Sequence, residues 1–244
     1  MKKIFCVFVC AVAFLACTEK DSCAVSFADF KTYLSETFLN PFAKDLGSLL
    51  GGGTFDGTDC GFPGVDVNFK FVMIDKPSVE DLILPQNTLV GIPYGQVEVG
   101  LPMGIGVLAR GFSLSIDSNN VAILGFGAKY KIVEESPVLP AIAVYGTYNF
   151  LSNFPDFDAS TISINIAVSK GFSPLPVGVY AVAGVDFTTV QSKVAGFTDV
   201  KGTATGYRAN AGIRISPLPL FYLNGDIGFA NGSTSYNAGA GLGF

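Results

Sequence analysis

The 244-residue sequence contains no histidine and no tryptophan, and only 14% of its residues are charged. Histidine is the commonest general base, the usual partner of a nucleophilic serine or cysteine, and the commonest metal ligand. Its absence excludes most hydrolytic mechanisms. We therefore expect the chain not to be an enzyme, and we expect neither a cofactor nor a metal site.

Long apolar runs and basic clusters are also missing. Mean hydropathy is +0.46 and 49% of the residues are apolar. Nevertheless, no stretch after residue 16 stays apolar for the ~20 residues that a membrane-spanning helix needs. The net charge is −5, and the 15 lysines and arginines are scattered along the chain. A nucleic-acid partner is therefore not expected.

The N-terminus has the layout of a secretory signal peptide, which we assign to residues 1–24. Lys2 and Lys3 precede an apolar run over residues 4–16, which is too short to cross a bilayer. Cleavage near residue 16 would leave Cys17 as a lipidated N-terminus, whereas cleavage near residue 24 would remove it. The sequence does not decide between these sites, nor whether Cys23 is retained and pairs with Cys60.

Residues 25–53 form the one region with helical periodicity, because its apolar residues recur every three or four positions. Ser26 is suited to cap a first helix and Asn40 a second helix that begins at Pro41, while Gly51–Gly53 would end it. This amphipathic segment could be a plug or a periplasmic lid, but we favour packing against the periplasmic rim of the main domain. The apolar stripe consists of Phe27, Phe30, Leu34, Phe38, Phe42, Leu46 and Leu49.

From residue 61 to the end, the hydrophobic period changes to two, which is typical of strands. The segments are eleven to fifteen residues long, as in strands that cross a bilayer at a tilt. We therefore predict an all-β fold, a closed antiparallel transmembrane β-barrel of about 10 strands over residues 61–244, preceded by the short amphipathic helical segment. The predicted strands lie near 62–75, 88–101, 104–116, 120–134, 138–151, 158–171, 176–190, 203–216, 219–231 and 234–244.

Two details of the strand pattern lead to further predictions. Pro93 and Arg110 are out of phase in the second and third segments, which suggests β-bulges there. Similar Ser-Pro connectors precede several strands, and alternate turns of a barrel lie at one end. We therefore place these connectors on the periplasmic side. The prolines near strand starts are Pro102, Pro140, Pro176 and Pro219.

The polar face of the strands carries small residues and charges of both signs, as expected for the lumen of a barrel. Opposite charges there should pair, and we expect Asp226 to pair with Arg208 or Arg214. The lumen-facing candidates are Asp66, Lys70, Glu98, Lys129, Lys131, Asp186, Arg208, Arg214 and Asp226.

The last segment alternates apolar residues with asparagine and glycine and ends in phenylalanine. Tyr236, Leu242 and Phe244 share its apolar face. This arrangement resembles the C-terminal signal that the barrel assembly machinery recognises in outer-membrane proteins. The expected partners are therefore that machinery and outer-membrane lipid.

Several turn and strand-start motifs resemble a group of uncharacterised bacterial outer-membrane proteins, which are predicted barrels from spirochaetes and related phyla. The resemblance covers most of the exported chain and implies a fold and a location, the bacterial outer membrane, but no site residues. Its motifs are Gly51–Gly53, Gly61–Asp66, Val97–Pro102, Gly127–Tyr130 and Pro137–Ala141.

Three functions fit these observations. The first is a narrow or plugged passive channel for a small, including a hydrophobic, solute. The second is a closed structural or surface-interaction barrel, similar to an adhesin, that transports nothing. The third is a secreted soluble β domain or lipoprotein. The sequence names neither the solute nor the partner, and it does not give the oligomeric state.

Overall fold

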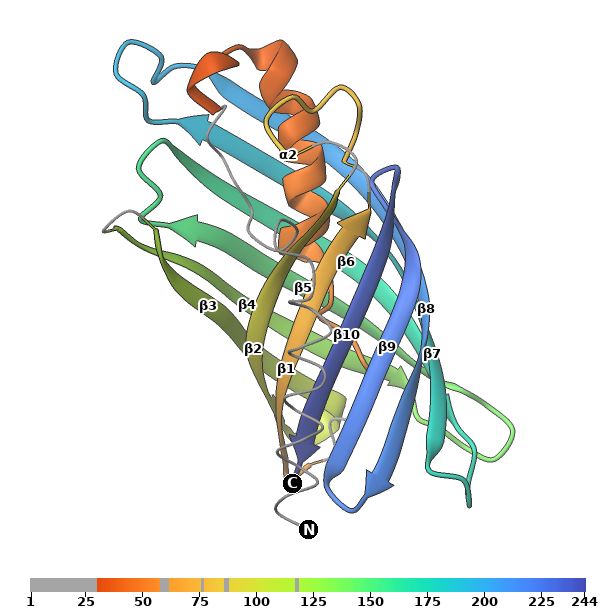
Figure 1. The fold of residues 1–244 in the computed structure, drawn as a ribbon. Helices are drawn as coiled ribbons and strands as arrows, with labels where there is room; N and C mark the ends of the chain where they lie inside the picture. Colours follow the sequence, from red (N-terminus) through yellow and green to blue (C-terminus); the bar gives the residue numbers. More distant parts are fainter. Residues whose placement is uncertain (1–29, 58–61, 76, 86–87, 117–118) are drawn as a thin grey trace.

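The computed structural model describes residues 30–57, 62–75, 77–85, 88–116 and 119–244. The predicted signal peptide with Cys17, and both members of the Cys23–Cys60 pair, lie outside the described residues. Within them, ten antiparallel strands close into a barrel, and one α-helix enters it from one end (Figure 1). The predicted fold class is confirmed.

The ten strands lie within a few residues of the predicted segments. Each one is followed along the chain by its neighbour in the barrel, and β1 pairs with both β2 and β10. The strands are β1 (Gly64–Asp75), β2 (Leu89–Gly100), β3 (Ile105–Ile116), β4 (Asn119–Val133), β5 (Ala141–Ser152), β6 (Phe157–Gly171), β7 (Val177–Ser192), β8 (Lys201–Leu218), β9 (Phe221–Ala230) and β10 (Ser233–Gly243).

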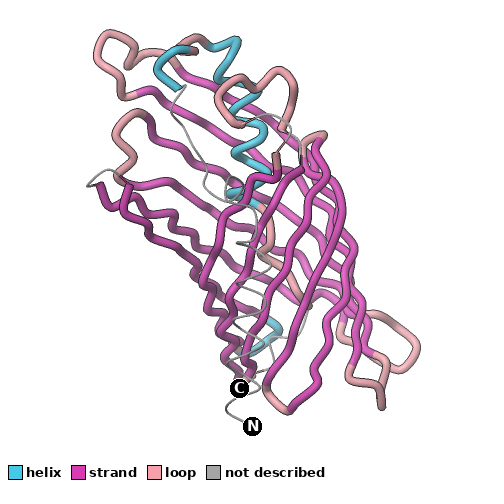
Figure 2. The backbone as a smooth tube through the Cα atoms, viewed as in Figure 1, coloured by secondary structure: helices cyan, strands magenta, loops and turns pink. Residues whose placement is uncertain are grey.

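The C-terminal residue completes the closure of the barrel. Val65 N donates to Phe244 O at 3.1 Å, and Phe244 N donates to Val65 O at 2.8 Å. We call this end of the barrel the C-terminal end, and the loops at 134–140, 172–176 and 219–220 lie there too (Figure 2). The opposite end, which holds the helix, is called the helix end. The Ser-Pro connectors thus share one end, as the sequence pattern predicts.

Side chains alternate between the two faces of the wall over most of each strand. Outward residues are apolar and accessible, such as Phe126 at 56%, Ile164 at 56% and Tyr207 at 65% exposure. Many inward residues are polar and buried, such as Thr161 and Asp186, both at 0%, whereas those that surround α2 are apolar. This inversion of the usual arrangement of a soluble protein is what a lipid-facing wall around a polar interior requires.

The bulges predicted in the second and third segments are wrong. Pro93 lies opposite Phe71 in a continuous β1–β2 ladder, and Arg110 points inward opposite Gln96. Pro93 is tolerated because β2 pairs with β3 only from Gly95 onward, so no ladder bond to β3 is lost there. The register shifts that occur in the described residues lie between Lys131 and Val133 and between Ile215 and Leu218.

The helical segment also differs from its prediction. A 3₁₀ turn, η1 (Phe30–Thr32), precedes one helix, α2 (Glu36–Gly51), which continues through Pro41. The carbonyl that Pro41 cannot serve belongs to Thr37, which is exposed, so water can satisfy it. Asn40 caps no helix, because its Oδ1 accepts a 2.8 Å bond from Thr203 N of β8.

A short 3₁₀ turn, η2 (Pro102–Gly104), joins β2 to β3 at the C-terminal end. No helix in the described part of the chain has both the length and the apolar character to span a membrane.

Candidate functional site

The helix α2 lies inside the barrel and not on its rim. It contacts β1, β5, β6, β7 and β8, and its residues from Leu46 to Gly51 are buried on every side. Figure 1 shows it descending from the helix end into the lumen. The preferred prediction, packing against the periplasmic rim, is therefore wrong for α2. We call α2 together with residues 52–57, which continue down the lumen, the plug.

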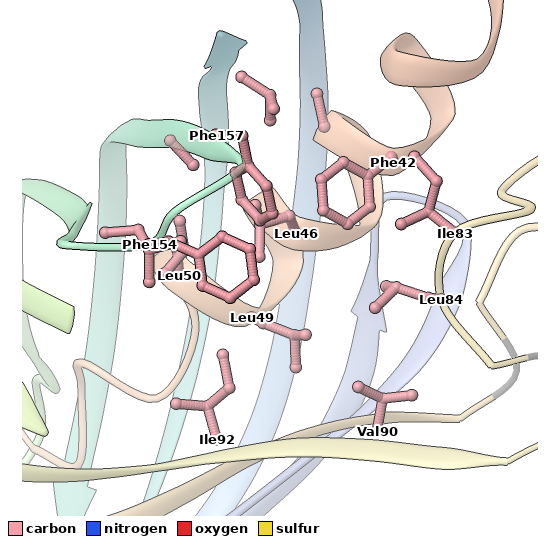
Figure 3. Close-up of a cluster of buried hydrophobic side chains, with 14 of the residues drawn as sticks. Phe42, Leu46, Leu49, Leu50, Ile83, Leu84, Val90, Ile92, Phe154 and Phe157 are labelled. Atoms are coloured by element: carbon pink, nitrogen blue, oxygen red, sulfur yellow. The ribbon is translucent and has the colours of Figure 1, made fainter. Parts of the chain in front are cut away.

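The face of α2 that carries large apolar side chains forms an apolar core in the half of the lumen near the helix end. Phe42 and Phe157 meet edge to face at 5.4 Å between ring centroids, and Phe30 lies 4.6 Å from Phe157. The apolar stripe of α2 thus packs against apolar residues of the barrel wall and its loops. Figure 3 shows Phe42, Leu46, Leu49 and Leu50 of α2 facing Ile83, Leu84, Val90, Ile92, Phe154 and Phe157.

The opposite face of α2 carries small residues where it meets the polar wall. A Cβ atom built at Gly51 would lie 2.5 Å from Ser163 Oγ and 2.6 Å from Asp186 Oδ1. Likewise, a Cβ atom at Gly202 of β8 would lie 2.5 Å from Leu39 O. The two glycines therefore allow the helix to approach the wall closely.

The last turn of α2 is held through its main-chain carbonyls. Arg110 donates from Nη1 to Gly52 O at 2.6 Å and from Nη2 to Leu50 O. Arg208 Nη2 donates to Gly47 O at 3.3 Å, and Tyr94 OH donates to Leu49 O at 3.2 Å. The carbonyls of Leu49 and Leu50 belong to the last turn of α2, where the helix supplies no i+4 N–H and where its negative pole lies, so donors from the wall suit them.

Beyond α2, the plug continues through a polar part of the lumen. Lys70 Nζ and Gln96 Nε2 both donate to Thr54 O, each at 3.1 Å. The ring of Phe55 stacks against Tyr145 at 5.6 Å between centroids. Side chains of the wall thus fix the plug over its whole described length.

Asp56 is the charged anchor of the plug. Its Oδ2 lies 3.1 Å from Lys70 Nζ and accepts a 3.0 Å bond from Tyr222 OH, while Arg214 is 3.8 Å from its Oδ1. The same Tyr222 hydroxyl lies 2.6 Å from Asp66 Oδ1. Asp56 therefore balances positive charge that the wall contributes.

The predicted lumen residues fall into several groups. Asp186 forms an ion pair with Arg208, and Glu98 forms one with Lys129, within the wall itself. Lys70, Asp66 and Arg214 surround Asp56 as described. Lys131 is half-buried beside the register shift in β4.

The predicted pairing of Asp226 with an arginine is wrong. Its carboxylate accepts bonds from Asn210 Nδ2 at 2.7 Å, Asn237 Nδ2 at 2.6 Å and Tyr180 OH at 2.9 Å. Arg208 is engaged by Asp186, and Arg214 lies over the ring of Tyr222 at 3.6 Å. The carboxylate is thus stabilised by neutral donors instead of by a cation.

We expect Asp226→Ala to destabilise the barrel by about 2 kcal/mol, because three donors lose a charged acceptor. Asp226→Asn, which keeps an acceptor, should cost less. Loss of heat-modifiable mobility on gels at a lower temperature would measure the difference. An unchanged transition in the alanine variant would show that this hydrogen-bond cluster has no structural weight.

Two carboxyl groups, those of Asp45 and Asp81, are buried together where α2 meets the β1–β2 connection. Burial, together with the neighbouring Asp81, raises the pKa of Asp45 to about 7. Burial likewise raises the pKa of Asp81. Asp45 Oδ2 accepts a 2.7 Å bond from Ser78 N, and Asp81 Oδ1 accepts one of 2.8 Å from Ile83 N. The pair thus joins the plug to this connection.

Some inward amide groups lack partners within the described residues. They include both side-chain polar atoms of Asn165 and the Oδ1 atoms of Asn224 and Asn237. Buried polar atoms of this kind are normally satisfied by water. Water in the lumen can therefore satisfy these atoms.

Sequence reasoning missed two important residues, Arg110 and Asp56. The sequence pattern predicts a bulge at Arg110, but the side chain points inward in phase with Leu108. Asp56 lies three residues after Gly53, beyond the predicted helix. The one signal in the sequence is an acidic residue close to an apolar segment.

Solved structures similar to this chain are β-barrels of low sequence identity. They include the N-terminal β-barrel domain of OprF from Pseudomonas aeruginosa, at 11% identity over 73% of this chain and 97% of that chain, with a TM-score of 0.35. Ail, the attachment invasion locus protein of Yersinia pestis, has 12% identity over 74% and 97% of the two chains, with a TM-score of 0.35. The Acinetobacter baumannii outer membrane protein Omp33 has 9% identity over 74% and 97%, with a TM-score of 0.34. Similarities at this level support no functional argument.

No curated protein matches the sequence. A family model does match, over residues 78–244, which covers β2 to β10 and therefore most of the barrel wall. The chain belongs to the family of unknown function DUF6588.

Proposed function

We propose that this protein is a bacterial outer-membrane barrel that forms a narrow channel for small solutes, and that the plug closes the channel in the state described above. The plug fills the lumen through α2 and residues 52–57. The helix end would face the cell exterior, because the C-terminal strand and the Ser-Pro connectors mark the periplasmic end. On this view, the protein has no enzymatic activity.

The outward face supports a membrane location. Phe69, Phe126, Tyr148, Ile162 and Tyr207 are between 46% and 65% exposed, and they belong to five different strands. A continuous apolar surface of this kind around a closed barrel is stable only in lipid.

The proposal also includes the route to the membrane. The signal peptide would direct export, and Tyr236, Leu242 and Phe244 would present the barrel to the assembly machinery. The backbone of Phe244 is paired with β1, while its side chain is 64% exposed. The resemblance to spirochaete outer-membrane proteins agrees with this location.

The observation that carries the channel proposal is the way in which the plug is held. The wall grips the C-terminal turn of α2 through backbone carbonyls, whereas the wall ion pairs Asp186–Arg208 and Glu98–Lys129 need no plug residue. If the plug left, the wall would keep these two pairs, although Lys70 would lose Asp56, and the half of the lumen near the C-terminal end would remain polar. Part of the wall charge is therefore balanced without the plug, as a lumen that opens requires.

Two glycine substitutions, one on the wall and one on the plug, test this proposal at the places where α2 touches the wall. Gly202→Val on the wall collides with the backbone of Leu39, and Gly51→Val on the plug collides with Ser163 and Asp186. Both should unseat α2, expose it to protease, and raise planar-bilayer conductance at least tenfold over the nearly closed parent protein.

The matched control is Gly146→Val, on the outward face of β5, where a Cβ atom would approach its nearest neighbour only to 3.7 Å. It should leave conductance unchanged. Heat-modifiable gel mobility would verify that each barrel is folded. If α2 becomes protease-sensitive in both glycine variants and neither conducts, the channel proposal is rejected in favour of a closed structural or surface-interaction barrel.

A further inference from the structure

The barrel wall is split between β2 and β3 over its half near the helix end. The β2–β3 ladder pairs only Gly95–Gly100 with Gly106–Gly111. Beyond Gly95, residues 89–94 of β2 pair with β1 alone, and residues 112–116 of β3 pair with β4 alone among the described residues. The split spans six residues of β2, or about 20 Å of strand. Figure 1 shows the two strands diverging there.

The inward side of the split is apolar, unlike the polar lumen below it. Val90, Ile92 and Tyr94 of β2 point inward at 3%, 5% and 1% exposure. They belong to the same buried cluster as Leu84, Leu49 and Phe154 (Figure 3). A molecule that passed through the split from the lipid would therefore meet hydrocarbon first.

A cation lies at the foot of the split. Arg110 is next to Gly111, the last residue of β3 that pairs with β2, and it is 4% exposed. Its guanidinium binds the neutral oxygens of Leu50, Gly52 and Asn149 and lies 4.5 Å from the Tyr94 ring. Among the described residues, no carboxylate is paired with it. A buried guanidinium with neutral partners is a strong site for a carboxylate, which it can bind in a bidentate manner.

We propose that the split admits a fatty acid from the lipid, with its alkyl chain in the apolar cluster and its carboxylate on Arg110. The apolar lining selects a long hydrocarbon chain, and the cation at its inner end selects an anionic head group.

This inference rests on the proposed function, since it names the solute class of the plugged lumen. The carboxylate would replace Leu50 O and Gly52 O as the acceptors of Arg110. Because those two bonds hold the last turn of α2, binding of the head group and release of the plug are coupled. The seated plug and the fatty acid compete for one cation.

The experiment uses palmitic acid that carries a diazirine, added to the full exported chain in lipid vesicles, with its methyl ester as the neutral comparison. After irradiation, the labelled peptides are mapped by mass spectrometry. We expect the acid to label peptides containing residues 83–94, with competition by unlabelled palmitate, and the ester to label them at least tenfold less. The Arg110→Ala variant should lose this preference for the acid, and Arg110→Lys should keep part of it.

A thiol bridge tests the route. Continuation of the β2–β3 register would place position 93 opposite position 113, so Pro93→Cys with Ser113→Cys can be joined by a short bifunctional reagent. The matched control joins Val97→Cys to Ala109→Cys, which are already paired and share the outward face. Both pairs are made with the other cysteines replaced by serine. Bridging the first pair should reduce acid labelling at least tenfold, and bridging the second should not.

The outcomes separate this inference from the channel proposal. Equal labelling by acid and ester, or labels confined to lipid-facing residues such as Val97, would overturn the fatty-acid site even if Gly202→Val conducts. Undiminished labelling after bridging positions 93 and 113 would overturn the lateral route. Selective labelling without conductance in the unseated variants would retain the binding site and reject the channel.

Discussion

Replacement of Asp186 by alanine is expected to lower the free energy of unfolding by about 3–5 kcal/mol, the usual cost of removing one partner from a buried ion pair. The Asp186 side chain is 0% exposed, and its Oδ2 accepts a 3.0 Å bond from Arg208 Nε. Its Oδ1 accepts a 2.6 Å bond from Ser163. Without the carboxylate, the Arg208 guanidinium would remain in the lumen with the carbonyl of Gly47 as its remaining acceptor among the described residues. Urea unfolding in micelles, followed by gel mobility, measures the loss.

Two variants control for the charge and for the shape of this pair. Asp186→Asn keeps an acceptor for Ser163 and should cost less than alanine. The double variant Asp186→Leu with Arg208→Met removes both charges and should recover most of the stability, because no uncompensated charge is left. A loss below about 1 kcal/mol in Asp186→Ala would mean that lumen water satisfies Arg208 without its partner.

The wall of the barrel could be predicted from the sequence because its signal is local. Alternation such as Ile162, Ile164 and Ile166 fixes both the strand and its lipid-facing side, and the structure places all three near 50% exposure. Turn residues then set the strand boundaries. A period of two therefore determines the ten strands and their two faces without any knowledge of which strands are neighbours.

The interior could not be predicted in this way, because its contacts depend on distances across the lumen. Arg208 and Arg214 lie on one face of β8, but only the closed barrel shows that Asp186 and Asp56 reach them before Asp226 does. The acceptors of Arg110 are main-chain carbonyls, which leave no trace in a side-chain pattern. Similarly, helical periodicity shows that α2 buries one face, but not that its small face also meets a wall.

The second large expected effect is a loss of plug anchoring as the pH rises. A carboxyl group whose pKa is higher in the folded protein contributes stability that is complete below its unfolded pKa of about 4. That stability disappears as the pH rises through the folded pKa, which is about 7 for Asp45. At acidic pH, a proton between Asp45 and Asp81 removes their repulsion and holds the β1–β2 connection on α2. Lys44 is the neighbouring cation that offsets part of this repulsion when both groups ionise.

Hydrogen exchange at the Ser78 amide, which donates to Asp45 Oδ2, reports this contact directly. After correction for the intrinsic exchange rate, its protection should fall about 10²-fold between pH 5 and pH 8.5, corresponding to on the order of 3 kcal/mol. Asp45→Asn keeps the shape and an acceptor but cannot ionise, so its protection should be equal at both pH values. Asp45→Ala should be weakly protected throughout. If the wild-type amide is protected equally at both pH values, the two carboxyl groups share no proton, and the plug is anchored independently of pH.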